Sequence, residues 1–188
     1  MDEKYVKVNG KDHYDLNCID HITKYITAHL FVEERSLQKC KEFLGQIKIT
    51  CYDQILEIYK KEKNKPKKKR KLIIFVSDKF HNYKTAWRKH FFRVTKLVFG
   101  LSIACHKYGL EHNNNPIERY NGSIKSRTKI MRGGFRSDEG GEAFTNFKRV
   151  IHNFVNPHHE LNGKTPESYS VHEKPYHEKM TVSHFRSV

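Results

Sequence analysis

The hydrophobic period of this chain changes once, near residue 36, and that change limits the folds open to it. Before it, apolar and polar residues alternate in three stretches, at residues 5–8, 14–18 and 26–32. Alternation is typical of half-buried strands. Asn9-Gly10, between the first two stretches, supplies the positive-φ pair of a tight hairpin turn. The opening of the chain therefore predicts an antiparallel meander of three strands.

After the change, apolar residues recur at helical spacing. Ser36 suits the N-cap position, and a helix is predicted over residues 37–47, with helical character resuming over 55–59. A continuous apolar run, Leu72–Val76, comes next. Such a run is typical of a strand buried on both faces, as in a parallel sheet covered by helices.

The second half of the chain is predicted to be mainly helical. A helix through Trp87 and Phe91 leads to a strand over residues 96–103. Asn115 and Pro116 mark a helix start, because Asn suits the N-cap and Pro the first helical position. That helix is predicted to end near residue 132, and a last one begins at residue 137 or 138. The order predicts an α/β fold, a mixed sheet flanked by helices.

Positive charge is concentrated in two segments. The chain has 36 Lys and Arg against 21 Asp and Glu, a net charge of +15. Lys60–Lys71 holds nine basic residues and one acid, and Arg119–Arg136 holds six and none. Such segments favour a polyanion partner, nucleic acid first, although a solvated basic surface is the alternative. No apolar run approaches the ~20 residues of a membrane span, so no membrane partner is expected.

Cysteine and histidine usage predicts neither a disulfide framework nor a zinc site. The four cysteines form no CxxC pair, which favours a reducing compartment. Neither Cys105-His106 nor His158-His159 has partners at a recognised ligand spacing. We expect a location in the cytoplasm or at the nucleoid of a prokaryote, and a nuclear one only in a eukaryotic host. The match of Pro66–Arg70 to a nuclear-import signal is weak, since DNA-binding loops are also Lys-rich.

Three carboxylates lie at positions where the predicted fold could bring them together. Asp2 opens the first strand, Asp78 follows the buried strand, and Glu118 lies in the first turn of the Asn-Pro helix. Clustered carboxylates repel one another unless a cation neutralises them, and hard oxygen ligands suit Mg²⁺ or Mn²⁺. Structural roles remain open for each: a capping box for Glu118, a helix cap for Asp78 and a solvated chain end for Asp2.

Four ordered segments resemble the catalytic blocks of one family. Asn113–Lys125 looks like the third block of bacterial and archaeal insertion-sequence transposases of the DDE superfamily, which are related to retroviral integrases. Ser77–Tyr83 resembles their second block, an Asp after a hydrophobic strand with an aromatic residue five positions on. Asp2–Lys11 resembles the first block, and Asn156–Pro166 resembles the closing motif.

The resemblance implies an RNase H-like fold with a mixed five-stranded sheet. It implies that Asp2, Asp78 and Glu118 hold two Mg²⁺ or Mn²⁺ ions, for nicking of transposon ends and transfer of the 3′-hydroxyl into target DNA. Paired ends also imply a homodimer. Lys125, two helical turns after Glu118, matches a basic residue that binds DNA near the scissile end. Further phosphate-binding residues are expected on the same segment: Arg119, Arg127, Lys129 and Arg132.

Two features depart from the family pattern. Members usually carry an N-terminal DNA-binding region, which we expect to be absent here, since the chain starts one residue before Asp2. The first strand is then expected to lack its lead-in residues. The connection over residues 47–71 is also longer and more basic than usual. We predict a catalytic domain at residues 1–170 and a polar tail at 171–188. The alternatives are an inactive DNA-binding remnant of a truncated transposase and an RNase H-like nuclease without strand transfer.

Overall fold

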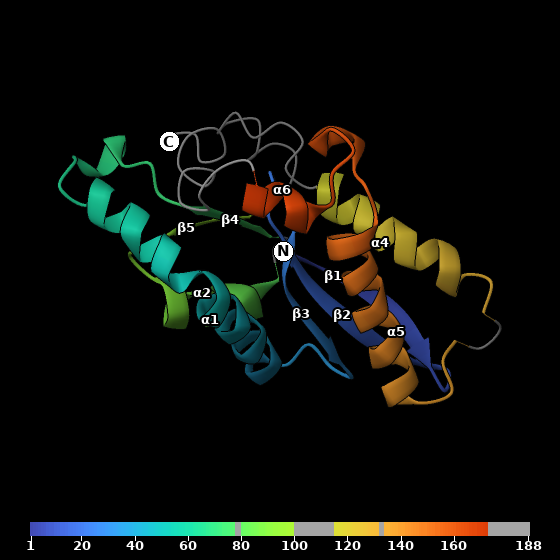
Figure 1. The fold of residues 1–188 in the computed structure, drawn as a ribbon. Helices are drawn as coiled ribbons and strands as arrows, with labels where there is room; N and C mark the ends of the chain where they lie inside the picture. The colour runs from blue at the N-terminus through green and yellow to red at the C-terminus, as the bar shows by residue number, and fades with distance from the viewer. Residues whose placement is uncertain (78–79, 100–114, 132–133, 173–188) are drawn as a thin grey trace.

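The computed structural model describes residues 1–77, 80–99, 115–131 and 134–172 (Figure 1). The predicted tail, 171–188, lies almost entirely outside these ranges. Within them, no helix is both long and apolar enough to cross a membrane.

The predicted meander is confirmed as a three-stranded antiparallel sheet. Strands β1 (Asp2–Val8), β2 (Lys11–Ile19) and β3 (Ile26–Val32) lie in the order β1-β2-β3. At the hairpin, Asn9 and Gly10 have φ angles of 49° and 76°. This left-handed pair closes a two-residue turn whose twist matches that of the flanking strands.

Helix α1 (Leu37–Glu62) is one continuous helix of 26 residues rather than two segments. Ser36 caps it as predicted, because its side chain accepts from the amide of Lys39 at 3.3 Å. Buried Cys51 carries the apolar stripe across the interval where the prediction placed a break. Seven buried side chains pack this helix against the sheet and α2: Cys40, Phe43, Leu44, Ile47, Cys51, Ile55 and Ile58.

A parallel pair of strands follows. Strands β4 (Ile74–Ser77) and β5 (Lys96–Phe99) pair with Ile74 opposite Lys96, and helix α2 (His81–Phe91) connects them. Strand β4 begins two residues later than predicted. The predicted part of β5 beyond residue 99 lies outside the described residues.

The five described strands form two hydrogen-bonded sheets, of three and two strands. The predicted single five-stranded sheet is therefore not confirmed. A bond beside the start of β1 reaches β4: the Met1 amine donates to the main-chain oxygen of Val76 at 2.8 Å. Met1 is only 7% exposed, so the start of β1 is held in the core and not loosely anchored as expected.

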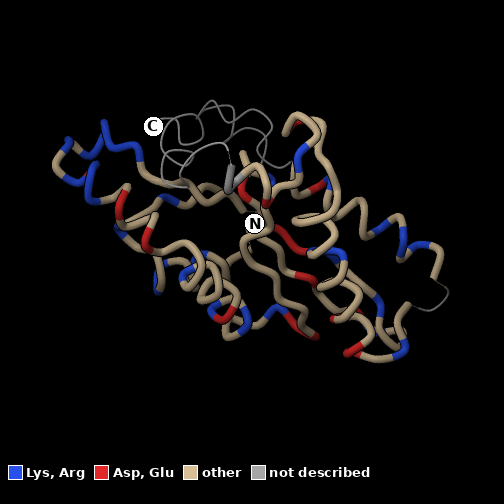
Figure 2. The backbone as a smooth tube through the Cα atoms, viewed as in Figure 1, with Lys and Arg blue, Asp and Glu red and all other residues tan. Residues whose placement is uncertain are grey.

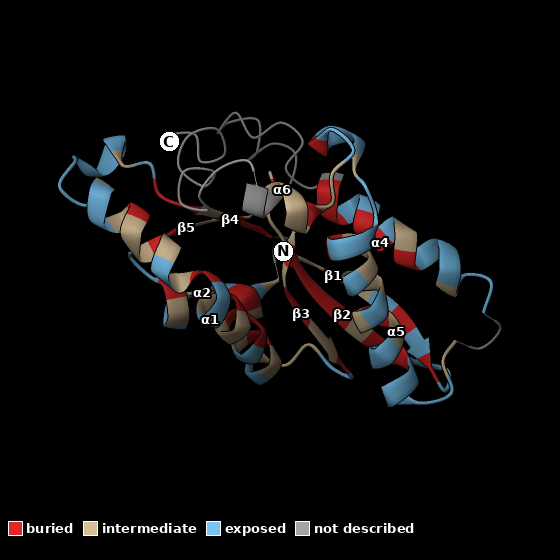
Figure 3. Ribbon diagram, viewed as in Figure 1, coloured by how far each residue is buried: buried red, intermediate tan, exposed pale blue. Residues whose placement is uncertain are grey.

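Two of the C-terminal helices, α4 (Asn115–Thr128) and α5 (Asp138–Val150), cover the face of the three-stranded sheet that is opposite α1 (Figures 1 and 3). Helix α4 begins at Asn115 itself and ends before the predicted residue 132. Helix α5 begins where predicted, and the Ser137 side chain caps it. The chain then forms a π-helical turn, η2 (Ile151–Val155), a 3₁₀ turn, η3 (His159–Leu161), and helix α6 (Pro166–His172).

The connection between α4 and α5 lies against β1. Phe135 donates its amide to the oxygen of Lys7 and accepts from the amide of Asn9, both at 2.8 Å. Gly134 makes this approach possible, because it has a φ of 77° and a Cβ there would overlap the Lys7 carbonyl. This contact fixes the loop that follows α4.

Candidate active site

Asp2 lies between the sheet and α4. It opens β1 opposite Asn17 of β2 and is half-buried. Its Oδ2 accepts a hydrogen bond from the Asn121 side-chain amide of α4 at 2.9 Å. The acid of the first block therefore lies against the helix of the third block, 119 residues away in sequence.

Glu118 and Lys125 lie along α4 on either side of Asn121. Glu118 is exposed in the first helical turn, three residues before Asn121, and Lys125 is exposed four residues after it. Residues three and four apart share one side of a helix. Burial, followed by the charge of Lys125, lowers the pKa of Lys4, whereas the charge of Asp2 acts in the opposite direction. Lys4, Lys125 and Asp2 are thus electrostatic neighbours.

Three side chains pack α4 on the core. Ile117, Tyr120 and Ile124 are at most 3% exposed, and Tyr120 and Ile124 form a cluster with Ile26 of β3. Met131, farther along the chain, lies beyond the helix end and is 37% exposed. Glu118, Asn121 and Lys125 therefore lie on a different side of α4 from these core-packing residues.

Asp78 lies outside the described residues, and so does Arg132. The residues flanking Asp78 are described. Ser77 is fully buried at the end of β4, and Val76 accepts the bond from Met1. On the other side, Tyr83 of α2 donates its hydroxyl to Oε2 of Glu3 at 3.2 Å. Both flanks of residue 78 are therefore tied to the immediate neighbours of Asp2.

Glu3 is a buried carboxylate that sequence reasoning missed. Its side chain is 4% exposed and forms an ion pair with Arg35. The Arg35 guanidinium also lies over the ring of Phe80, 4.6 Å from its centroid. Alternation along β1 places Glu3 on the opposite face from Asp2. The sequence did offer a signal for Glu3. An acidic residue at a core-facing position of a strand requires a cationic or hydrogen-bond-donor partner.

A polar cluster lies in the sheet on the Asp2 side. Asp15 and Asn17 are fully buried, and the Asn17 amide donates to Oδ2 of Asp15 at 2.8 Å. His29 Nε2 lies 2.6 Å from Oδ1 of Asp15. Since these residues alternate with the apolar core positions of β2 and β3, their face is polar where it meets α4. Sequence reasoning missed this set as well.

The predicted DNA-binding residues of α4 fall into two groups. Lys125 and Lys129 line a groove of about 360 Å³ beside β1, together with Tyr5 and Lys7, and Arg127 is exposed near them in sequence. Arg119 instead pairs with Glu160 of the closing motif. It is therefore an ion-pair partner here and is not directed toward Asp2 with the others.

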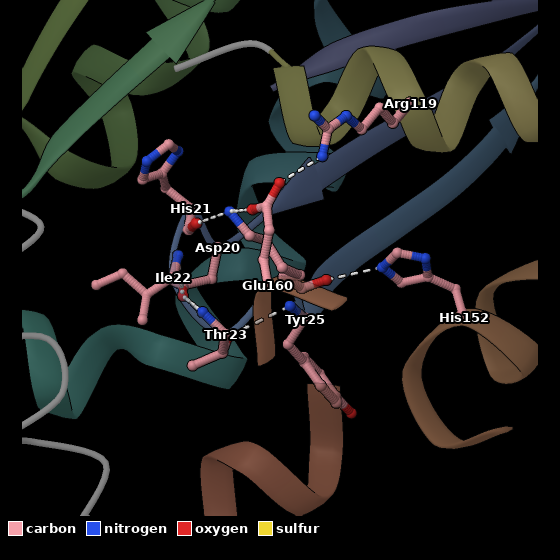
Figure 4. A network of polar contacts seen from close by, with 9 residues as sticks. Asp20, His21, Ile22, Thr23, Tyr25, Arg119, His152 and Glu160 are labelled. Carbon is pink, nitrogen blue, oxygen red and sulfur yellow. Dashed lines mark hydrogen bonds and ion pairs between the residues drawn. The ribbon is translucent and has the colours of Figure 1, made fainter. Parts of the chain in front are cut away.

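The closing motif is held by a polar network (Figure 4). Glu160 pairs with Lys24 at 2.8 Å as well as with Arg119, and these hydrogen bonds lower the pKa of Glu160 to about 2. His152 donates from Nε2 to the main-chain oxygen of Lys24 at 2.8 Å, and burial lowers the pKa of His152 to about 4. The network joins the turn after β2, the start of α4 and the closing motif.

These contacts bring described parts of the four sequence blocks together. A family model described as a DDE domain matches residues 1–158. The chain belongs to the DDE transposase family. The predicted family resemblance is thus confirmed. No curated protein matches the chain.

Two solved structures are similar to this DDE domain. A chain of the simian T-cell lymphotropic virus intasome, in complex with PP2A regulatory subunit B56 gamma, has a TM-score of 0.50 at 11% identity, over 92% of this chain and 52% of that one. The catalytic core domain of BIV integrase has a TM-score of 0.49 at 14% identity, over 96% and 97%. At 11% identity, the similarity to the intasome chain shows a shared fold and nothing more. The chain spans about half the length of the intasome chain.

Proposed function

We propose that this chain is a catalytic domain that nicks DNA at transposon ends and transfers the freed 3′-hydroxyl into target DNA. Asp2, Asp78 and Glu118 are the proposed ligands of two Mg²⁺ or Mn²⁺ ions. The hydrogen bond from Asn121 to Asp2 carries the proposal, because it brings the acid of the first block to the helix of the third. Membership in the DDE family supplies the reaction class.

The described donor set fits such ions. Asp2 and Glu118 offer only carboxylate oxygens, which hard divalent cations prefer. The Asn121 amide orients the Asp2 carboxylate, as outer-shell partners of metal ligands commonly do. Two divalent ions bound there would supply activation of the attacking water or 3′-hydroxyl and stabilisation of the leaving oxygen.

The surrounding cations are proposed to hold the DNA backbone. Lys125 and Lys129 share the groove beside β1. The charges of Lys125 and Asp2 both act on Lys4. Ammonium groups so placed bind phosphates and fix the strand beside the carboxylates. Arg127, which is exposed on α4, extends the same surface, and Arg132, outside the described residues, stays a predicted phosphate contact. Arg119 contacts DNA in this account only when its pair with Glu160 opens.

We also propose that the two sheets are parts of one RNase H-like, five-stranded sheet. The bond from the Met1 amine to Val76 supports this, because it brings the start of β1 to the edge of β4. The order of strands would then be β3-β2-β1-β4-β5.

The alternative of an inactive DNA-binding remnant predicts no metal-dependent chemistry. A supercoiled plasmid in Mn²⁺ should be nicked by the wild-type chain. Asp2→Asn and Glu118→Gln should each reduce the nicking rate at least 10²-fold, since loss of one catalytic contact is worth about 10²–10³. Asp53→Asn, an exposed acid of α1, is the matched control. Equal nicking by all four proteins would overturn the proposal.

A second assay separates strand transfer from simple nuclease activity. A radiolabelled duplex with a free 3′-hydroxyl, incubated with plasmid and protein, should become joined to the plasmid. A nuclease would shorten the duplex without joining it. Because transposon ends are paired, we also propose a homodimer, and sedimentation of the DNA-bound protein as a monomer would contradict it.

A further inference from the structure

We propose a second metal site, for a borderline transition-metal ion such as Zn²⁺, formed by His13, Glu33 and Asp138. It is separate from the catalytic carboxylates. His13 lies four residues along β2 from Asn17, the partner of Asp2, which is about 13 Å of strand. Nothing in the family assignment requires these three residues.

Three separate elements bring the ligand atoms together. His13 is on β2, Glu33 directly follows β3, and Asp138 opens α5. Tyr14 pairs with Val32, so the continued register puts His13 opposite Glu33. One donor atom from each residue lies within 4.8 Å of the others, and His13 Nε2 is 2.9 Å from Oδ1 of Asp138.

The burial of His13 points to a ligand. Its side chain is 7% exposed and its ring stacks on Phe31, with centroids 5.6 Å apart. Its Nδ1 has no hydrogen-bond partner within the described part of the chain, and its Nε2 faces Oδ1 of Asp138 at 2.9 Å without hydrogen-bond geometry. A buried polar atom without such a bond is costly, and metal coordination would satisfy it. Asp138 is 51% exposed, so the site has an opening for the ion and for water.

The donor set selects a metal different from that of the catalytic carboxylates. One imidazole nitrogen and two carboxylate oxygens are donor atoms that Zn²⁺ accepts, and water can occupy the remaining position. Mg²⁺ favours oxygen donors, so it should bind here more weakly than Zn²⁺. Two carboxylates balance the charge of the ion.

The local charge also suits a cation. Glu34 and Glu139 adjoin two of the ligands, and Figure 2 shows acidic residues after β3 and at the start of α5 in a chain otherwise rich in Lys and Arg. The N-terminal dipole of α5 opposes a cation. It is worth about half a charge, and the two ligand carboxylates outweigh it. The simpler arrangement, protonated His13 paired with both acids, makes the opposite prediction about zinc.

The expected role is structural, since the ion would join α5 to the sheet. Helix α5 already approaches the sheet closely at Gly141, where a Cβ would lie 2.7 Å from the ring of Phe31. Holding residue 138 against His13 would keep the first turn of α5 in this position.

Calorimetric titration of metal-free protein with ZnCl₂ tests the site, with thermal unfolding as a second readout. Wild type should bind one Zn²⁺ tightly and gain melting temperature. Glu33→Gln and Asp138→Asn should not bind this Zn²⁺ ion tightly, and zinc should not raise their melting temperatures. Glu34→Gln and His159→Gln are the controls, and both should bind as wild type does. Circular dichroism without metal establishes that each variant is folded.

Two results would overturn the site. One is equal zinc binding by wild type, Glu33→Gln and Asp138→Asn, and the other is loss of the zinc equivalent in His159→Gln instead. Plasmid nicking in Mg²⁺ keeps this test distinct from the proposed function. Glu33→Gln should nick at the wild-type rate, so either proposal can fail while the other stands.

Discussion

Single side chains, far apart in sequence, hold the candidate active site together. Asn121 joins α4 to Asp2, and Tyr83 joins α2 to Glu3. Asp2 and Glu118 lie at their predicted positions, at the start of β1 and in the first turn of α4. Glu3 and Arg35 could not be predicted, since their pairing spans 32 residues and depends on which face of β1 is covered.

Replacing Asn121 tests the support of Asp2. Asn121→Ala removes the amide that orients the carboxylate, and loss of an outer-shell partner typically reduces metal affinity or activity 10–100-fold. We expect the nicking rate to fall by that factor, with the Mn²⁺ concentration for half-maximal rate rising. Ser126→Ala, on an exposed position of α4, should retain the wild-type values. An unchanged metal dependence in Asn121→Ala would remove Asn121 from the site.

The buried imidazole of His152 predicts a dependence of stability on pH. Its pKa is about 4 in the folded protein and ~6.5 when unfolded, so the unfolded chain binds the extra proton between these values. Stability is therefore lost as pH falls from 6.5 toward 4, by about 2 kcal/mol between pH 7 and pH 5. Urea unfolding at both pH values measures this loss.

The His152→Gln variant isolates that contribution, because the amide keeps a donor near the oxygen of Lys24. Its loss of stability between pH 7 and pH 5 should be about 2 kcal/mol smaller than that of wild type. His159→Gln, an exposed neighbour in sequence, should behave as wild type does. An equal loss in His152→Gln would show that His152 titrates normally in the folded state.

At the scale of helices and strands, prediction succeeded where the hydrophobic period is regular. The meander, the Ser36 cap and the starts of α4 and α5 are close to their predicted positions. The predicted break in α1 was wrong, since Cys51 continues its buried stripe. The early end of α4 was also missed. The last turn of α4 is polar and has no apolar side chain that packs on the sheet. The next apolar residues, Ile130 and Met131, are exposed, so they do not extend the helix by packing.

The hydroxyl of Tyr83 should stabilise the contact between α2 and β1. Tyr83→Phe keeps the buried ring but removes the hydrogen bond to the Glu3 carboxylate, and such bonds to charged groups are worth about 1–3 kcal/mol. Urea unfolding should show a loss of that size. Tyr52→Phe is the matched control, since its ring beside Lys48 is kept and little change is expected. A loss below about 0.5 kcal/mol in Tyr83→Phe would mean that the bond contributes no net stability.

The basic connection after α1 should contribute to DNA binding and take no part in the catalysed reaction. Its turn η1 (Lys67–Lys69) is fully exposed and projects from the end of α1 (Figure 2). Replacing its three lysines with Ala should weaken binding to a random duplex and reduce the salt slope, log K against log[salt], by up to about 3 × 0.9. Fluorescence anisotropy at several salt concentrations measures both quantities.

A second triple variant controls for net charge alone. Replacing three exposed residues of α2 by Ala removes the same charge elsewhere: Lys84, Arg88 and Lys89. If both triple variants lose affinity equally, η1 has no specific part in DNA binding and acts only through overall charge.

At the scale of the whole molecule, helices lie on both faces of the three-stranded sheet, and α2 and α4 contact the first residues of β1 (Figure 1). The sequence was sufficient for the α/β class and for the family, because ordered local motifs carry both. The single five-stranded sheet that it predicted is not confirmed, since strand pairing is non-local, and the network of Lys24, Arg119 and Glu160 was not predicted. Those pairs form only after α4 and the closing motif meet the turn after β2.

Calorimetric binding of Mn²⁺, with a short DNA duplex present, tests the central claim most directly. Wild type, Asp2→Asn and Asp78→Asn are titrated side by side, with Asp53→Asn as the control. The account predicts saturable binding by wild type and Asp53→Asn, and its loss in Asp2→Asn and in Asp78→Asn, because both carboxylates serve one site. Equal weak binding by all four proteins would contradict it and would leave a DDE domain that does not assemble its metal centre.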